Sequence, residues 1–111
     1  MQNKKQIAIF ISGTGSNATN IIRYFKFSEK AEVRVLLSNK PEKGANAISL
    51  NEDVELLSFQ KEELINSTSI VDFLKEKNID LIVLAGFLLK IPETMVKVFP
   101  DKIINIHPAL L

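Results

Sequence analysis

The sequence contains no cysteine and only one histidine, His107. Without cysteine the chain cannot form a disulfide, a thiolate nucleophile or a thiolate metal site. A single histidine also excludes a zinc site built from several histidines. We therefore expect no bound metal, and the lack of cysteine is compatible with a reducing compartment.

The chain also lacks a strong net charge and long apolar segments. Lysine and arginine total 14 and aspartate and glutamate total 13, which gives a formal net charge of +1. Neither nucleic acid nor an anionic membrane is then an expected partner, and any bound anion needs a local site. No apolar run approaches the roughly 20 residues that cross a bilayer. The run at 7–11 is too short for a secretion signal and leads into a glycine-rich segment.

Hydrophobic residues make up 46% and charged residues 24% of the 111 residues, which suits one globular domain or part of one. Five segments are typical of strands: Gln6–Ser12, Glu32–Ser38, Val54–Ser58, Asp80–Gly86 and Lys102–His107. Four segments between them have helical spacing of apolar residues: Asn17–Phe27, Glu42–Asn51, Thr68–Lys77 and Pro92–Phe99. This alternation predicts an α/β fold, a doubly wound and mostly parallel sheet.

Further expectations concern the surface and the last strand. We expect the charged segment Glu62–Lys77 to be a surface helix over the sheet. Five phenylalanines are expected in the core or at its rim: Phe25, Phe27, Phe73, Phe87 and Phe99. No strand follows residues 102–107, so we expect an incomplete domain whose uncovered edge could support oligomer formation.

The segment Ser12-Gly13-Thr14-Gly15-Ser16-Asn17 joins the first strand to the first helix. Glycine permits close approach of a ligand to the backbone, and Ser16 or Asn17 could cap a helix whose N-terminus favours an anion. We favour a phosphate-binding turn over a turn whose glycines serve geometry alone. The spacing also fits a dinucleotide fingerprint, but no carboxylate follows the second strand at Ser38-Asn39-Lys40, which disfavours a nicotinamide dinucleotide.

Asn105 and His107 lie two positions apart at the end of the last predicted strand, so they share one face. We expect Ile104 and Ile106 on the opposite face, in apolar packing. An amide that donates to an oxyanion and an imidazole that transfers protons suit acyl transfer. The alternative is that Asn105 bonds loop backbone and His107 packs as a partly buried ring. The pattern alone leaves both open.

Three motifs taken together resemble those of the glycinamide ribonucleotide formyltransferases: SGTGSN, LAGF and INIHPALL. The resemblance covers essentially the whole chain, and the third motif is common to folate-dependent formyltransferases. It implies a Rossmann-like fold, with residues 1–111 as the phosphate-binding and partial catalytic N-terminal region of a single domain. It also implies a cytoplasmic enzyme that uses glycinamide ribonucleotide and 10-formyltetrahydrofolate without a metal.

The resemblance also implies roles for particular residues. The substrate phosphate would be held by Gly15, Ser16 and Asn17. The folate would be bound by Leu88, Leu89, Lys90, Ile91 and Asn105. Asn105 would stabilise the oxyanion and His107 would transfer protons.

Two departures and one gap accompany the resemblance. Many relatives have Met-Arg-Ile-Leu where this chain has residues 88–91, and an arginine near the third strand has no counterpart among residues 61–63. The family's catalytic aspartate would lie beyond residue 111, so we expect the chain alone to be inactive and weakly folded. The competing hypotheses are a formyltetrahydrofolate hydrolase and a non-catalytic module that binds a nucleotide phosphate.

Overall fold

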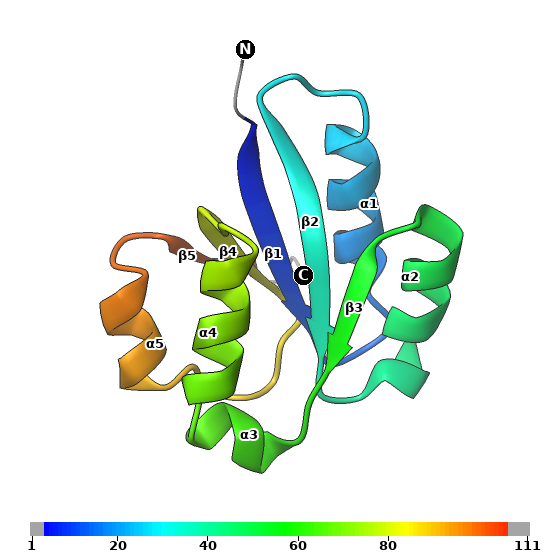
Figure 1. The fold of residues 1–111 in the computed structure, drawn as a ribbon. Helices are drawn as coiled ribbons and strands as arrows, with labels where there is room; N and C mark the ends of the chain where they lie inside the picture. The colour runs from blue at the N-terminus through cyan, green and yellow to red at the C-terminus, as the bar shows by residue number, and fades with distance from the viewer. Residues whose placement is uncertain (1–3, 107–111) are drawn as a thin grey trace.

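The computed structural model describes residues 4–106, which form one five-stranded sheet with the order β3-β2-β1-β4-β5 (Figure 1). The strands are Lys5–Ile11 (β1), Ala31–Ser38 (β2), Glu55–Ser58 (β3), Leu81–Ala85 (β4) and Ile103–Ile106 (β5). All four neighbouring pairs are parallel. The predicted α/β class and the positions of all five strands are therefore confirmed.

Helices cover both faces of this sheet (Figure 1). They are Ser16–Phe25 (α1), Ala45–Glu52 (α2), Lys61–Ile65 (α3), Thr68–Glu76 (α4) and Glu93–Val98 (α5), with a short 3-10 helix at Pro41–Lys43 (η1). Ile22 of α1 and Ile48 of α2 belong to one apolar cluster, and Leu74 of α4 and Met95 of α5 belong to a second. The sheet is thus doubly wound, with one core on each face.

The sequence of the central strand β1 is continuously apolar because both faces of the strand are buried. Ile7, Ile9 and Ile11 pack toward α1 and α2, whereas Ala8 and Phe10 pack toward α4 and α5. Each of these side chains is at most 2% exposed. Because burial of a large apolar side chain contributes about 1.5–3 kcal/mol, both faces of this strand stabilise the fold.

Two predicted helices are interrupted. The segment predicted as one helix, Glu42–Asn51, divides at Gly44 into η1 and α2. The charged segment Glu62–Lys77 divides into α3 and α4, with Ser67 between them at a φ of 23°. The apolar periodicity correctly predicted helical structure in both segments. It could not predict the break in each helix, because one residue with a non-helical backbone does not change the spacing of the apolar residues.

Two predicted burials are wrong. Phe27 follows α1 and is 90% exposed, although it was expected to pack in the core or at its rim. Ile104 was expected in apolar packing, but it is 48% exposed, whereas Ile106 packs partly against the cluster under α1 and α2. The physical reason for Ile104 is its position on an edge strand, because within residues 4–106 β5 pairs only with β4.

Candidate active site at the carboxyl ends of the strands

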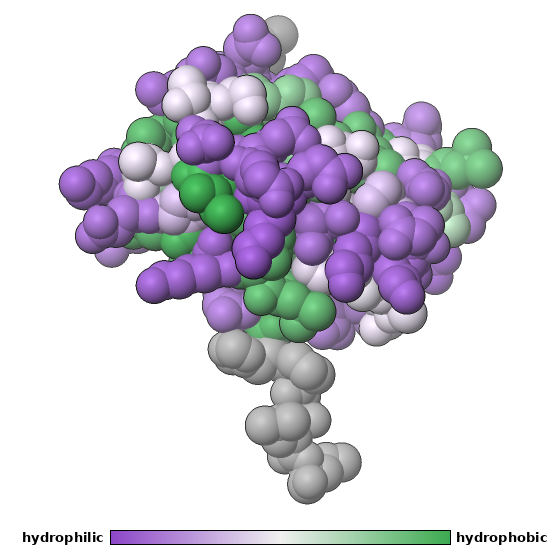
Figure 2. Space-filling view, turned by 90° about the horizontal axis from the view of Figure 1, so that it is seen from below, coloured by the Kyte–Doolittle hydropathy of each residue, from purple (hydrophilic) through white to green (hydrophobic). Residues whose placement is uncertain are grey.

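The carboxyl ends of β1, β4 and β5 lie in adjacent positions at one edge of the sheet. Residues 12–15 follow β1, residues 86–92 follow β4, and Asn105 lies near the end of β5. From β1 the chain proceeds to β2 on one side, whereas β4 lies on the other side, and ligands of open α/β sheets bind at such a switch point. Figure 2 views this end of the molecule, where the surface is mainly hydrophilic with separate apolar patches.

The turn after β1 depends on Gly15, which precedes α1 with a φ of 78°. A side chain there would begin 2.5 Å from Ile48 Cδ1 and 2.8 Å from Ile11 Cδ1. The left-handed backbone therefore favours glycine, and any larger residue would also have to displace the ends of these two isoleucine side chains. The expected capping by Ser16 or Asn17 is wrong, because Gly15 occupies the cap position without a side-chain hydrogen bond and α1 begins at Ser16.

Gly44, which precedes α2, packs against the same glycine-rich turn. A Cβ at this position would collide with the backbone of Thr14, including its carbonyl oxygen. The backbone of Gly44 is extended, with a φ of 175°, so close approach rather than conformation requires glycine here. The start of α2 thus packs directly against the glycine-rich turn.

Gly13 differs from both of these glycines. A Cβ at Gly13 would meet no atom within 4 Å, and the residue is exposed. Nothing in the fold therefore requires glycine at this position. A bare backbone facing open space is what close approach of a ligand needs.

Ser12 joins three of the loops at this edge. Its side chain is 2% exposed, and its hydroxyl accepts a hydrogen bond from the Leu88 backbone N–H at 3.0 Å. The same hydroxyl donates to Oδ1 of Asn39 at 2.8 Å. The segments that follow β1, β2 and β4 are therefore connected through one buried oxygen.

The four residues expected to bind folate through the loop after β4 do not share one environment. Leu88 is 77% exposed and Lys90 is also exposed, whereas Leu89 and Ile91 pack partly against the core. Phe87 anchors the loop, since its ring lies 5.3 Å from that of Phe10 in an edge-to-face contact. The outward surface of this loop is therefore formed by alternate residues, Leu88 and Lys90.

Asn105 lies in β5 opposite Leu84 of β4 and is exposed. Leu84 belongs to the apolar cluster under α4 and α5, so the alternation of the strand places Asn105 on that face of the sheet. No hydrogen bond to another of residues 4–106 holds its carboxamide. His107 lies outside the described residues, so the expected pairing with Asn105 stays a prediction.

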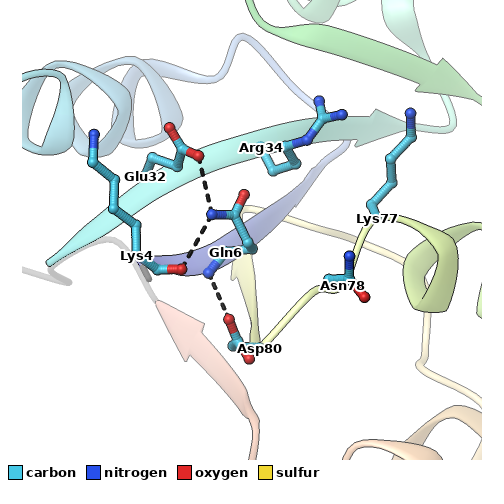
Figure 3. Close-up of a pocket in the computed structure, with 7 residues that line it drawn as sticks. All are labelled: Lys4, Gln6, Glu32, Arg34, Lys77, Asn78 and Asp80. Carbon is cyan, nitrogen blue, oxygen red and sulfur yellow. Dashed lines mark hydrogen bonds between the residues drawn. The ribbon is translucent and has the colours of Figure 1, made fainter. Parts of the chain in front are cut away.

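A cavity lies at the opposite edge of the sheet, where the strands begin. It has a volume of about 660 Å³ and is lined by Lys4, Gln6, Glu32, Arg34, Lys77, Asn78 and Asp80 (Figure 3). Its polar groups largely satisfy one another, because Gln6 donates to Asp80 through its backbone N–H and to Glu32 through its side chain. Three cationic and two acidic side chains line it, so its charges are mixed and nearly balanced.

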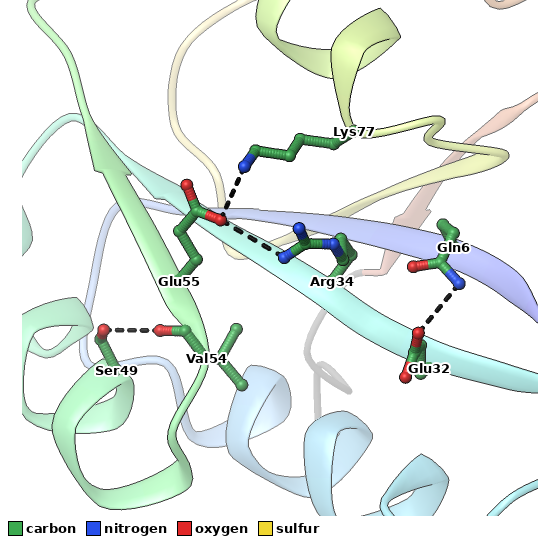
Figure 4. Close-up of polar contacts among 7 residues, drawn as sticks. All are labelled: Gln6, Glu32, Arg34, Ser49, Val54, Glu55 and Lys77. Atoms are coloured by element: carbon green, nitrogen blue, oxygen red, sulfur yellow. Dashed lines mark hydrogen bonds and ion pairs between the residues drawn. The ribbon is translucent and has the colours of Figure 1, made fainter.

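Ion pairs continue from that cavity to the edge strand β3. Glu55 Oε1 lies 3.3 Å from Arg34 and 3.0 Å from Lys77, which connects β3 with β2 and with the end of α4 (Figure 4). All three side chains are partly exposed, so these pairs stabilise the fold only modestly. This end of the molecule is consequently best explained as structural.

Within residues 4–106, no three histidine, aspartate or glutamate side chains gather as metal ligands would. In that range, every helix is too short or too polar to cross a bilayer.

Sequence reasoning missed two positions of this site, Asn39 and Gly44, and gave Ser12 no role. Asn39 was considered only as a position without a carboxylate. The signal for Ser12 was its place inside the SGTGSN motif, immediately after a buried strand. No local signal marks Gly44, because the backbone that it contacts lies 30 positions earlier in the sequence.

Comparison with protein families gives one match. The family described as formyl transferase matches residues 5–111. A chloroplastic phosphoribosylglycinamide formyltransferase of Arabidopsis thaliana is 34% identical over 97% of this chain and 39% of its own length. The phosphoribosylglycinamide formyltransferase of Bacillus subtilis is 33% identical over 96% of this chain and 57% of its own length.

Solved structures of formyltransferases are also similar to this chain. Glycinamide ribonucleotide transformylase 1 from Geobacillus kaustophilus matches with a TM-score of 0.88 and 31% identity, over 98% of this chain and 61% of that one. A formyltetrahydrofolate deformylase from Pseudomonas putida matches with a TM-score of 0.81 but only 13% identity, which shows a common fold alone. The chain thus spans less than two thirds of the length of each of these proteins.

Proposed function

The chain belongs to the formyl transferase family, and we propose that the protein transfers a formyl group from 10-formyltetrahydrofolate to the amine of glycinamide ribonucleotide. The observation that carries this proposal is the order of segments along one edge of the sheet. The glycine-rich turn after β1 lies next to the loop after β4, which lies next to Asn105 of β5. A turn suited to phosphate, a loop with apolar side chains and a polar donor thus lie side by side along this edge. This arrangement suits a phosphate-bearing substrate and a formyl donor that meet between them.

Phosphate binding is assigned to Gly15, Ser16 and Asn17. The open side of Gly13 and the first turn of α1 support this assignment, because the N–H groups of a helix N-terminus favour an anion. The packing of Gly44 against Thr14 would hold the turn in place before the ligand arrives. A preformed turn lowers the entropic cost of binding.

Folate binding is assigned to Leu88, Leu89, Lys90, Ile91 and Asn105. The exposed aliphatic side chain of Leu88 supports contact with a flat ring, and the partly buried Leu89 and Ile91 would hold the loop beneath it. The carbonyl and amide groups of this loop are polar groups that a pterin could pair with. Lys90 adds a positive charge at the outer side of the loop.

The proposed chemistry needs an oxyanion donor and a proton carrier. The amine nitrogen of the substrate attacks the formyl carbon, and the formyl oxygen gains negative charge, which the Asn105 carboxamide would stabilise. The bond from the formyl carbon to the folate nitrogen then breaks. His107 would take the proton that the amine loses and help to return one to the folate nitrogen.

Several parts of this proposal extend to the whole protein. We propose small-molecule substrates only, a cytoplasmic location and no requirement for a metal. Within residues 4–106, β5 pairs only with β4, and this edge supports the proposal that the 111-residue chain associates with a second copy. Cell fractionation tests the location and gel filtration tests the association, both independently of the chemistry.

The decisive experiment measures formyl transfer by the protein expressed from its full coding sequence. We expect tetrahydrofolate to form only when glycinamide ribonucleotide is present. Asn105→Ala should lower kcat by about 100–1000-fold, as expected for an oxyanion donor, without loss of stability because the residue is exposed. Asn51→Ala, at an exposed asparagine of α2, is the matched control and should leave kcat unchanged.

Two outcomes would contradict the proposal. Release of formate without dependence on the amine would identify a hydrolase. Phosphate-ligand binding without any formyl transfer, together with no effect of His107→Ala in cells, would identify a non-catalytic binding module.

A further inference from the structure

We propose that Ser12 is a positioning residue that holds the loop after β4 in the conformation that binds the formyl donor. This inference rests on the proposed function, since it assigns a role in that same site. Because Ser12 is only 2% exposed, it would act through the Leu88 amide rather than through contact with a substrate.

The direction of the two hydrogen bonds is fixed by their chemistry. The Leu88 N–H can only donate, so the Ser12 oxygen is the acceptor at 3.0 Å. The hydroxyl proton is then left for Oδ1 of Asn39, at 2.8 Å. Both bonds form simultaneously, and removal of the hydroxyl would break both.

The loop after β4 has little else to hold its backbone. Among the hydrogen bonds between residues 4–106, only the one from Leu88 to Ser12 involves residues 86–91. Gly86 has a φ of 68°, and no atom of the described residues lies within 4 Å of where its Cβ would be, so no close packing holds this side of the residue. Within residues 4–106, the amide of Leu88 is therefore the one polar anchor of the loop backbone.

Side chains supply the other anchor. The Phe87 ring lies 5.3 Å from the Phe10 ring and 6.1 Å from the Phe59 ring. Loss of the Ser12 hydroxyl would leave these contacts intact, so the loop would stay attached while its backbone moved. We therefore expect altered binding of the formyl donor rather than unfolding.

The glycine-rich turn is held by different contacts. Gly15 packs against Ile48 and Ile11, and Gly44 packs against Thr14, and none of these contacts involves the Ser12 hydroxyl. Phosphate binding should therefore be insensitive to its removal. This separation gives the inference a specific kinetic signature.

The test compares Ser12→Ala, Ser12→Thr and Ser38→Ala in the protein expressed from its full coding sequence. Ser38 is a matched control, because it is also a buried serine at a strand end whose hydroxyl accepts a backbone N–H, but that N–H belongs to Lys40 of its own loop. Hydrogen exchange of residues 86–91 is the first readout. The KM for 10-formyltetrahydrofolate and the KM for glycinamide ribonucleotide are the second.

Ser12→Ala should speed exchange across residues 86–91 and raise the KM for 10-formyltetrahydrofolate about tenfold, the effect of one lost hydrogen bond. The KM for glycinamide ribonucleotide should change less than about twofold. Ser12→Thr should restore both readouts toward wild type, and Ser38→Ala should change neither. Equal effects of Ser38→Ala, or an unchanged donor KM with unchanged exchange in Ser12→Ala, would overturn the inference.

Exchange of the Leu88 amide in the unmodified protein is a further test. In the unmodified protein the Leu88 amide should exchange slowly although its residue is 77% exposed, and rapid exchange would overturn the inference even if Ser12→Ala fails to fold. If the protein does not transfer formyl groups at all, the proposed function fails. The exchange comparison would still decide whether Ser12 holds the loop.

Discussion

The Leu88 backbone N–H donates a hydrogen bond to Ser12 Oγ across 76 positions of the sequence. The two residues meet because β1 and β4 are neighbours in the sheet and both loops leave its carboxyl edge. Parallel strands place their carboxyl ends together, so residues far apart in the chain become partners at this edge.

Gly15→Ala should lower the free energy of unfolding by about 1–3 kcal/mol, because the residue has a φ of 78° and its new Cβ would lie 2.5 Å from Ile48 Cδ1. Urea denaturation measures the change. Gly13→Ala is the control, and it should change stability by less than about 0.5 kcal/mol. Gly13→Ala should nevertheless weaken binding of glycinamide ribonucleotide, and unchanged affinity would argue against phosphate binding at this turn.

Gly44→Ala should destabilise the protein by about 1–3 kcal/mol, because the added Cβ meets the Thr14 backbone rather than a flexible side chain. Relief of this collision must move the glycine-rich turn, so the affinity for glycinamide ribonucleotide should fall as well. Calorimetric titration measures it. Asn46→Ala, at an exposed position in α2, should alter neither quantity.

Asp80→Ala should cost about 1–2 kcal/mol of stability, because the half-buried Gln6 N–H loses its carboxylate acceptor at 2.8 Å. Asp80→Asn should cost less, since the amide oxygen can still accept. Thermal unfolding distinguishes the two variants. Both should retain the wild-type KM for each substrate, and a change in KM at unchanged stability would show that the cavity in Figure 3 has a functional role.

Glu55→Gln should reduce stability by less than about 1 kcal/mol, although it removes ion pairs to both Arg34 and Lys77. The side chain is 40% exposed, so water and salt screen both pairs. Unfolding in low and in high salt is the measurement. The difference from wild type should shrink as salt is added, and a difference that persists in high salt would contradict screening.

Ile104→Thr should weaken self-association of the 111-residue chain, because Ile104 is 48% exposed on the edge strand β5. Sedimentation velocity at several concentrations measures the effect. Leu50→Thr, at an 83% exposed leucine of α2, is the control and should leave association unchanged. Equal effects of the two substitutions would indicate nonspecific hydrophobic contact instead of edge pairing.

Three segments show which structural features the sequence patterns predicted and which they did not. The continuous apolar run at residues 7–11 predicted a strand buried on both faces, and β1 has that environment. The periodicity of residues 42–51 predicted a helix, but the interruption at Gly44 follows from contact with Thr14, which no local pattern encodes. Ile104 was expected to pack because strand alternation assigns it to an apolar face. Its exposure depends on what lies beside β5.

For the candidate site, too, some features were predicted from the sequence and others were not. The motif after β1 was singled out from its residue types, whereas the loop after β4 was singled out only through the resemblance to formyltransferases, and both lie at one edge of the sheet. Their contact through Ser12 was not predicted, because a buried serine in a motif does not reveal which distant amide it will meet.

The sequence by itself determined the strand and helix segments, the α/β class and the motifs characteristic of formyl transferases, because periodicity and short motifs are properties of neighbouring residues. Only the tertiary structure decided that β4 lies beside β1, that Gly44 supports the glycine-rich turn and that Leu88 and Lys90 face outward while Leu89 and Ile91 pack inward. These features depend on contacts between segments tens of residues apart. Such contacts are set by strand order and packing, which no single segment contains.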